Sequence, residues 1–219
     1  MQNITMNETI RTFVTNEIFS SNVYVIKWKN WWIIIDPWFY NSEIKDYLKK
    51  IWWVESILLT HGHWDHIRFV DEIKNDYPSS KIYIHEKDKE LLTNINLNCS
   101  LLVWRKEIII KSKVEFFDEC NMEIWWYTIR IIHLPWHTDW CSMFYIEELN
   151  SLFLGDVVME DSVWTLRTPT WDYNKMNASL WKFKHLWLDY NVECYPGHWE
   201  MRTYWRILKE NQFLRDHIL

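Results

Sequence analysis

Apolar and polar positions along the chain follow two recurring patterns, which predict strands and helices in turn. Short runs rich in β-branched and aromatic residues, bounded by polar residues, indicate strands. The ranges expected as strands are 22–28, 32–35, 56–60, 81–85, 107–111, 114–118, 127–132, 141–147, 151–154 and 192–195. Residues 148–150 are expected to form the turn of a hairpin between two of these strands.

Helices are predicted where apolar residues recur at every third or fourth position. The ranges expected as helices are 42–50, 66–76, 87–93, 175–187 and 202–211. Blocks of strands that are interleaved with helices indicate an α/β or α+β layered fold. A length of 219 residues, without internal repeats or linkers, predicts a single domain over residues 1–219.

The charge balance and the short apolar runs argue against several classes of partner. The formal net charge is −6 and no basic stripe is present, so we expect no nucleic-acid partner. The apolar runs are far too short to span a bilayer, and the N-terminus lacks a charged segment followed by an apolar one. We therefore expect no membrane association and a cytoplasmic location. The four cysteines form no C-x-x-C pair, which favours free thiols in a reducing compartment.

The composition contains 18 Trp and only 3 Gly. An average chain is about 7% glycine, so roughly fifteen glycines would be expected in a chain of this length. Trp38, Trp136, Trp140 and Trp199 stand next to Pro, Asp or His in strings typical of tight loops. Such loops often need a positive φ or a close approach of the backbone, which glycine provides and tryptophan does not.

We hypothesise that many of these tryptophans are glycines in the natural protein. Some bacteria read the codon UGA as glycine, and translation with a table that reads UGA as tryptophan would produce this pattern. UGG codons at Trp38, Trp136 and Trp199 would refute the hypothesis.

A dense cluster of metal-binding side chains directly follows the strand expected at 56–60. The segment reads Thr60-His61-Gly62-His63-Trp64-Asp65-His66. On an extended backbone His61 and His63 point to the same side, and Asp65 and His66 follow at the turn into a helix. Imidazole nitrogens and carboxylate oxygens are ligands that zinc accepts in proteins. The spacing therefore predicts a metal site.

Three further candidate ligands, His137, Asp156 and His198, each follow a strand-like run with Gly or Pro nearby. Side chains in loops at strand ends are held on a rigid support, which favours a functional role. The remaining histidines are interpreted differently. His185 and His217 are expected to be ordinary polar residues, and His85 is expected to lie outside the site.

The motif His-x-His-x-Asp-His is complete in this chain, and on this basis the chain resembles the metallo-β-lactamase superfamily. Further strings resemble those of its glyoxalase II-like (hydroxyacylglutathione hydrolase-like) members. These strings are Asp36-Pro37-Trp38, Pro135-Trp136-His137-Thr138, Gly155-Asp156 and Pro196-Gly197-His198. The resemblance implies a four-layer αββα sandwich, and it extends over almost the whole chain.

The resemblance also implies roles for the candidate residues. His61, His63 and His137 would bind a first metal, Asp65, His66 and His198 a second, and Asp156 would bridge both. The cofactors would be two divalent ions, with zinc favoured over iron or manganese. Asp65 would also orient the nucleophile as a catalytic residue. Asp36 and Thr60 are candidates for contacts behind the ligands, and Arg167 for contact with an anionic substrate group.

The function implied is metal-dependent hydrolysis of a small thioester or ester, as in glyoxalase II. Only about one helix is expected after His198, which makes a glutathione-specific site doubtful and leaves other acyl thioesters open. The main alternative is an oxidoreductase similar to persulfide dioxygenases, with one iron held by a subset of the same ligands. A β-lactamase, a nuclease and a non-enzymatic binding module are further alternatives. The expected partner is a small-molecule substrate, and the sequence leaves the oligomeric state open.

Overall fold

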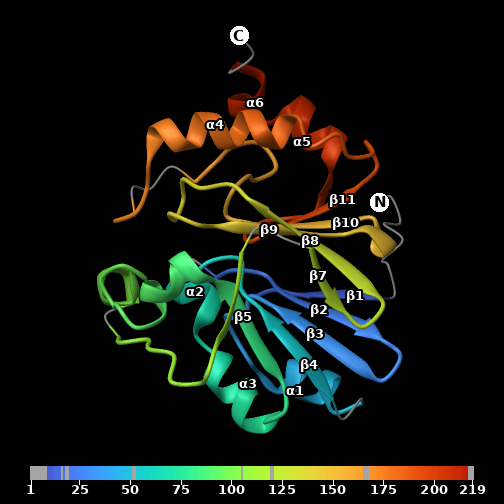
Figure 1. Cartoon of the computed structure of the whole chain (residues 1–219), viewed down its shortest axis with the longest axis vertical. Coiled ribbons are helices and arrows are strands. Elements are labelled where there is room, and N and C mark those ends of the chain that lie inside the picture. The colour runs from blue at the N-terminus through green and yellow to red at the C-terminus, as the bar shows by residue number, and fades with distance from the viewer. Residues whose placement is uncertain are drawn as a thin grey trace.

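The computed structural model describes residues 9–15, 17, 20–50, 53–104, 106–118, 121–164 and 168–216. Two β-sheets lie face to face, and helices cover the outer face of each, so the chain forms four layers (Figure 1). This arrangement confirms the predicted αββα sandwich. The single-domain interpretation remains a prediction.

Each sheet has six strands. The first sheet contains β1 (Ile10–Phe13), β2 (Val23–Trp28), β3 (Trp31–Ile35), β4 (Val54–Leu58), β5 (Lys81–His85) and β6 (Glu115–Phe117), paired in that order. The second sheet contains β7 (Asn121–Ile124), β8 (Tyr127–His133), β9 (Ser142–Ile146), β10 (Ser151–Gly155), β11 (Glu193–Pro196) and β12 (Arg202–Thr203), also paired in chain order. From β3 to β6 the neighbouring strands are parallel, whereas β10–β11 is the parallel pair of the second sheet.

The helices are divided between the two outer faces (Figure 1). Those on the first sheet are α1 (Ser42–Leu48), α2 (Trp64–Ile67) and α3 (Val70–Asp76). Those on the second sheet are α4 (Tyr173–Lys184), α5 (Tyr204–Glu210) and α6 (Gln212–Asp216). Shorter turns of helix are η1 (Glu86–Leu92), η2 (Ser100–Trp104) and η3 (Glu147–Leu149).

Alternation along the strands creates the layers. On β2, Val23 and Val25 pack toward the helices, whereas Tyr24 and Ile26 belong to the apolar cluster between the sheets. Successive side chains on a strand point to opposite faces, so a strand that is apolar on both faces is buried from both sides. A third apolar cluster joins the second sheet to its helices.

Several predicted elements differ from those observed. The helix expected at 66–76 is split into α2 and α3, because the backbone N–H of Phe69 turns to the carbonyl oxygen of Pro37, at 3.0 Å. Residues 87–93 lie mostly within η1, which is a 3₁₀ rather than an α-helix. The hairpin at 148–150 is confirmed, and Asn150 there adopts a left-handed conformation.

The strand predicted at 107–111 is wrong. Backbone N–H groups of this segment bond instead to the hydroxyl of Ser100, the carbonyl oxygen of Leu92 and the carboxylate of Asp71. These contacts come from outside the segment, so its apolar pattern did not reveal them. The prediction also missed β1, β7, β12 and α6, which are too short to carry a clear pattern, and β12 takes the first two residues of the helix expected at 202–211.

The backbone at the suspect tryptophans agrees with the glycine hypothesis at some positions only. Trp199 has a φ of 66°, as a loop glycine would, but Trp38, Trp136 and Trp140 are not among the residues with positive φ. Trp125 and Trp187, which the sequence analysis did not single out, have φ values of 58° and 53°. Trp136 is fully buried, and its indole N–H has no hydrogen-bond partner among the described residues. The codon assignment remains a hypothesis.

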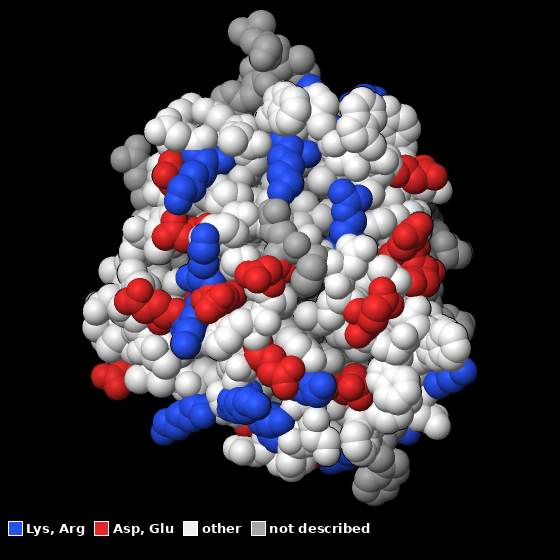
Figure 2. Space-filling model, in the orientation of Figure 1, with Lys and Arg blue, Asp and Glu red and all other residues white. Residues whose placement is uncertain are grey.

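On the face seen in Figure 2, acidic and basic side chains are intermixed.

Within the described ranges, no helix is both long enough and apolar enough to cross a membrane. Cys99, Cys141 and Cys194 are buried free thiols, and Cys120 lies outside the described residues. The expectations about partners and location remain predictions.

Candidate metal centre

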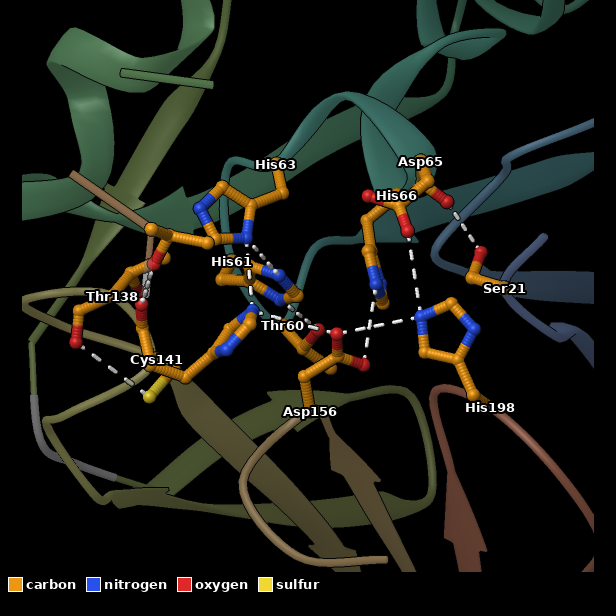
Figure 3. A network of polar contacts seen from close by, with 12 residues as sticks. Ser21, Thr60, His61, His63, Asp65, His66, Thr138, Cys141, Asp156 and His198 are labelled. Atoms are coloured by element: carbon orange, nitrogen blue, oxygen red, sulfur yellow. Dashed lines mark hydrogen bonds and ion pairs between the residues drawn. The ribbon is translucent and has the colours of Figure 1, made fainter. Parts of the chain in front are cut away.

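Seven buried His and Asp side chains converge at the edge where strands of both sheets end, and all of them except His137 are labelled in Figure 3. They come from the loops after β4, β8, β10 and β11 and from the short helix α2. They are His61, His63, Asp65, His66, His137, Asp156 and His198, each at most 7% exposed. The structure thus brings together every residue that the sequence predicted as a ligand.

Three imidazoles form the first group. The Nδ1 atom of His63 lies 3.1 Å from Nε2 of His61 and 2.9 Å from Nε2 of His137. Tetrahedral ligand atoms at about 2.0 Å from zinc lie about 3.3 Å apart. The three nitrogens are therefore spaced almost as they would be around one metal ion.

The second group consists of Asp65, His66 and His198, whose ligand atoms also lie close enough together to hold an ion. Nε2 of His198 is 3.4 Å from Oδ2 of Asp65. Asp156 lies between the two groups (Figure 3). Its Oδ1 is 3.4 Å from Nε2 of His66, and its Oδ2 is 3.4 Å from Nε2 of both His137 and His198.

The donor atoms fit a pair of metal ions. Nε2 of His66, Nε2 of His198 and Oδ1 of Asp156 are buried, and within the described ranges none of them has a hydrogen-bond partner. Buried polar atoms without partners are costly, and a cation at this point would satisfy all three. A set of imidazole and carboxylate donors suits zinc, iron or manganese.

Burial sets the electrostatics of the first group. Desolvation lowers the pKa of His63 to about 3 and that of His137 to about 4. Burial and the neighbouring imidazoles also hold the pKa of His61 well below its ordinary value. These imidazoles are neutral at pH 7, which is the form that binds a metal.

Carboxylates reverse this effect in the second group. Burial alone would lower the pKa of His198, but Asp156 and Asp65 outweigh it and raise the pKa to about 10. The pKa of His66 is likewise raised, because Asp156 and Asp36 overcome the burial penalty. Burial opposes ionisation of Asp156, yet His198 and His66 hold its pKa well below the usual range. This half of the centre therefore attracts positive charge strongly.

Asp36 and Thr60 lie behind the ligands, as the sequence predicted. Asp36 accepts hydrogen bonds from the backbone N–H of Thr60 at 2.8 Å and from its hydroxyl at 2.7 Å. Nδ1 of His66 is 2.9 Å from Oδ2 of Asp36, so the other ring nitrogen is directed into the cluster. A carboxylate partner of this kind fixes the orientation of a metal-binding imidazole.

Glycine is required at two positions beside the cluster. A Cβ atom on Gly197 would lie 2.1 Å from Oδ1 of Asp156, so a larger residue would displace that carboxylate. Gly155 has a φ of 51°, and a Cβ there would lie 2.6 Å from the Thr60 hydroxyl oxygen. Only glycine tolerates both the conformation and the close approach.

Asp88, a fully buried carboxylate in η1, was not predicted from the sequence as part of the site. Its Oδ2 accepts hydrogen bonds from the backbone N–H of Gly62 at 3.2 Å and from the hydroxyl of Thr138 at 2.9 Å. It therefore joins the loop that carries His61 and His63 to the loop that carries His137. The available signal was its position. Asp88 lies three residues after the end of β5, and this strand ends at the same edge of the sheet as the strand that precedes the histidine motif.

The remaining candidates lie elsewhere. The ring of His85 stacks on Trp140, with centroids 4.4 Å apart, and does not join the seven converging side chains. His185 stacks on Trp181 on the exposed side of α4. Arg167 and His217 lie outside the described residues, so their predicted roles remain untested.

Asp88 is expected to make the stability of the metal-free protein depend on pH. Burial raises its pKa from the usual 3.8 to about 7. Since the folded state binds this proton more tightly than the unfolded state, the stabilisation is present in acid and is lost as the pH rises from about 4 to about 7. Between pH 5 and 7, wild type should lose about 2 kcal/mol relative to Asp88→Asn.

Urea unfolding of both proteins in the presence of a chelator measures this difference. Asp88→Asn is a suitable reference, since it keeps a hydrogen-bond acceptor but has no titrating proton. Parallel stability curves for the two proteins would show that Asp88 keeps an ordinary pKa.

Two cavities adjoin the cluster. One, of about 210 Å³, is lined by ligand candidates and by Cys99, Leu102 and Val103. The other, of about 900 Å³, meets the cluster at His198. Trp164 lines both cavities, and its ring stacks on His198 with centroids 5.2 Å apart. Both cavities therefore border ligand candidates of the cluster.

The fold and the site together define a class of protein: facing β-sheets covered by helices, with a buried His and Asp cluster that could hold two metal ions. The chain belongs to the metallo-β-lactamase superfamily, whose family model matches residues 17–198. The family predicted from the sequence is thereby confirmed. Most members of this superfamily are hydrolases, and they typically bind two metal ions.

Individual relatives are more distant. The chain is 25% identical over 196 residues to a protein named hydroxyacylglutathione hydrolase from Francisella tularensis subsp. novicida, and the match covers 90% of this chain and 68% of that protein. It resembles the crystal structure of BLEG-1, a B3 metallo-β-lactamase, with a TM-score of 0.85, 26% identity and coverage of 94% and 99% of the two chains. It also resembles a di-iron-bound form of TTHA1623, with a TM-score of 0.77, 24% identity and coverage of 92% and 98%.

Proposed function

We propose that this protein is a two-metal hydrolase of a small thioester or ester. His61, His63 and His137 would hold the first ion and Asp65, His66 and His198 the second, and Asp156 would be the ligand shared by both groups. The position of Asp156, with contacts of 3.4 Å to ligand candidates of both groups, is the observation that carries the proposal. The ions are proposed to be zinc, and iron is the first alternative because the similar TTHA1623 structure is described as di-iron-bound.

Two bound divalent ions supply Lewis acidity, which lowers the pKa of a water molecule and polarises a carbonyl group. The protein positions the other participants. Asp65 is acidic and borders the smaller cavity, so it can orient the attacking water and accept its proton. The hydroxyl of Ser21 donates a hydrogen bond to the backbone oxygen of Asp65 and holds that residue in place.

The lining of the smaller cavity supports an uncharged acyl group as the substrate portion. Leu102 and Val103 are apolar, and their side chains are exposed at this cavity beside the cluster. Apolar lining with a few convergent polar groups is typical of small-molecule sites. A thioester such as a hydroxyacyl-glutathione, the substrate class named for the Francisella relative, belongs to the substrates proposed here.

The proposal predicts hydrolysis that depends on two equivalents of metal. Purified protein should contain about two metal ions per chain, and removal of the metal with a chelator should abolish turnover, because the proposed reaction depends on the ions to lower the pKa of the attacking water. The measurement combines elemental analysis with a panel of glutathione thioesters, simple acyl thioesters and small esters, before and after zinc or iron is restored.

Two assays test the alternatives directly. Turnover of nitrocefin without turnover of esters would favour a β-lactamase. A single iron per chain, with oxygen uptake on glutathione persulfide and no hydrolysis, would replace the proposal by the persulfide dioxygenase-like function. Full metal loading with no turnover on the whole panel would contradict hydrolysis and point to a binding module.

A further inference from the structure

Side chains behind the metal centre fall into two separate sets of contacts. Asp88 contacts Gly62, which lies between His61 and His63, and Thr138, which follows His137. These are the two loops of the first group. Both donors and the carboxylate are buried, so loss of the carboxylate would leave two buried donors without partners.

The segment of residues 20–22, directly before β2, contacts the second group. His198 has its Nδ1 atom 2.8 Å from the carbonyl oxygen of Ser20. Because a carbonyl oxygen only accepts, Nδ1 carries the proton and Nε2 is left as the ligand atom. The neighbouring Ser21 bonds to the backbone of Asp65, so this segment contacts two ligand candidates of the second group.

Asn22, the last residue of this segment, forms hydrogen bonds to the loop that carries His198. Its side-chain nitrogen donates to the carbonyl oxygens of Pro196 at 3.1 Å and Trp199 at 2.7 Å, on either side of His198. Its backbone N–H donates to the carbonyl oxygen of Gly197 at 2.6 Å. Asn22 therefore holds the loop that carries His198 much as Asp88 holds the loops of the first group.

We propose that Asp88 is a positioning residue for the first metal and Asn22 a positioning residue for the second, each acting on its own site. This inference rests on the proposed two-metal function. Asp156 is the ligand candidate shared by both groups, and among the described residues neither Asp88 nor Asn22 forms a hydrogen bond with it. Loss of a residue that orients metal ligands typically weakens metal affinity by about 10–100-fold.

The test is a zinc titration of metal-free protein against a chelating dye, which reports two dissociation constants. Asp88→Ala should weaken one zinc by about 10–100-fold and leave the other within about threefold. Asp88→Asn should largely restore binding, because its amide oxygen accepts the same two hydrogen bonds. Thr138→Val removes one of the two donors and should weaken the same zinc if Asp88→Ala does not fold.

A second background identifies which site is affected. His63→Ala removes a ligand of the first group, and one zinc should remain, bound by the second. In this background Asp88→Ala should change the remaining affinity by less than about threefold, whereas Asn22→Ala should weaken it by about 10–100-fold. Circular dichroism of each variant measures folding independently of metal binding.

A matched control comes from a similar contact away from the centre. Asp71→Asn alters a carboxylate that accepts backbone N–H bonds from Lys111 and Ser112. This variant should leave the two zinc constants unchanged.

The inference would be overturned if Asp88→Ala weakened the affinity for both zinc ions equally. It would also be overturned if the zinc that His63→Ala retains were lost when Asp88 is replaced as well. Either result leaves the two-metal function intact. If wild type itself binds no zinc, iron or manganese, the proposed function fails, and the inference fails with it.

Discussion

Replacing Asp156 by Asn is expected to lower hydrolysis by about 10³-fold or more and to reduce the bound metal from two ions to one or none. The side chain keeps its size but loses the charge that lies between the two groups of ligand candidates. Its carboxylate oxygens are 3.4 Å from three histidine nitrogens, and Asp65 is the other carboxylate among the seven ligand candidates. Electrostatic and Lewis-acid terms each contribute several kcal/mol to barriers of this kind.

The measurement pairs elemental analysis with kcat and kcat/KM on the best substrate of the ester and thioester panel. Asp46→Asn is the control, since Asp46 is an exposed carboxylate that pairs with Lys49 on the surface. That variant should match wild type in both metal content and rate. An Asp156→Asn protein with two ions and a nearly normal rate would remove the bridging role.

Replacing Trp125, Trp187 and Trp199 together by Gly is expected to stabilise the protein by about 2–4 kcal/mol. All three have positive φ, a conformation that costs a residue with a Cβ roughly 1–2 kcal/mol. All three side chains are also exposed, so little buried area is lost. Part of the gain is offset at Trp125, whose ring stacks on Trp31 with centroids 4.6 Å apart.

Thermal unfolding should detect this gain as a rise in Tm of roughly 5–15 °C. Trp181→Gly provides the opposite control, because Trp181 is exposed within helix α4, where glycine destabilises by about 1 kcal/mol. A triple variant that is no more stable than wild type would contradict the strain argument and weaken the case for glycine at these codons.

The histidine motif was predictable because its spacing is local. His61, His63, Asp65 and His66 lie within one strand end and one turn of helix, so their approach to one another needs no knowledge of the rest of the fold. His137, Asp156 and His198 were found by the same rule, since each follows a buried strand that ends at the same edge.

Asp88 and Asn22 were not predictable in this way. Asp88 looks like one of several acidic residues in a charged segment, and Asn22 like the first residue of a strand. Their importance comes from contacts across the fold, with Asn22 bonding to residues more than 170 positions away. The wrong strand at 107–111 has the same origin, because Asp71 and Leu92 take its hydrogen bonds.

The amino-acid sequence by itself determined the layered class of fold, since alternation of apolar residues depends on each strand's own faces. It also determined the kinds of donor atoms available to a metal. Only the tertiary structure decided that Asp156 lies between two groups and that Asp88 and the segment before β2 support different halves. Those relations depend on the order and facing of the two sheets, which bring distant residues together and which no local pattern encodes.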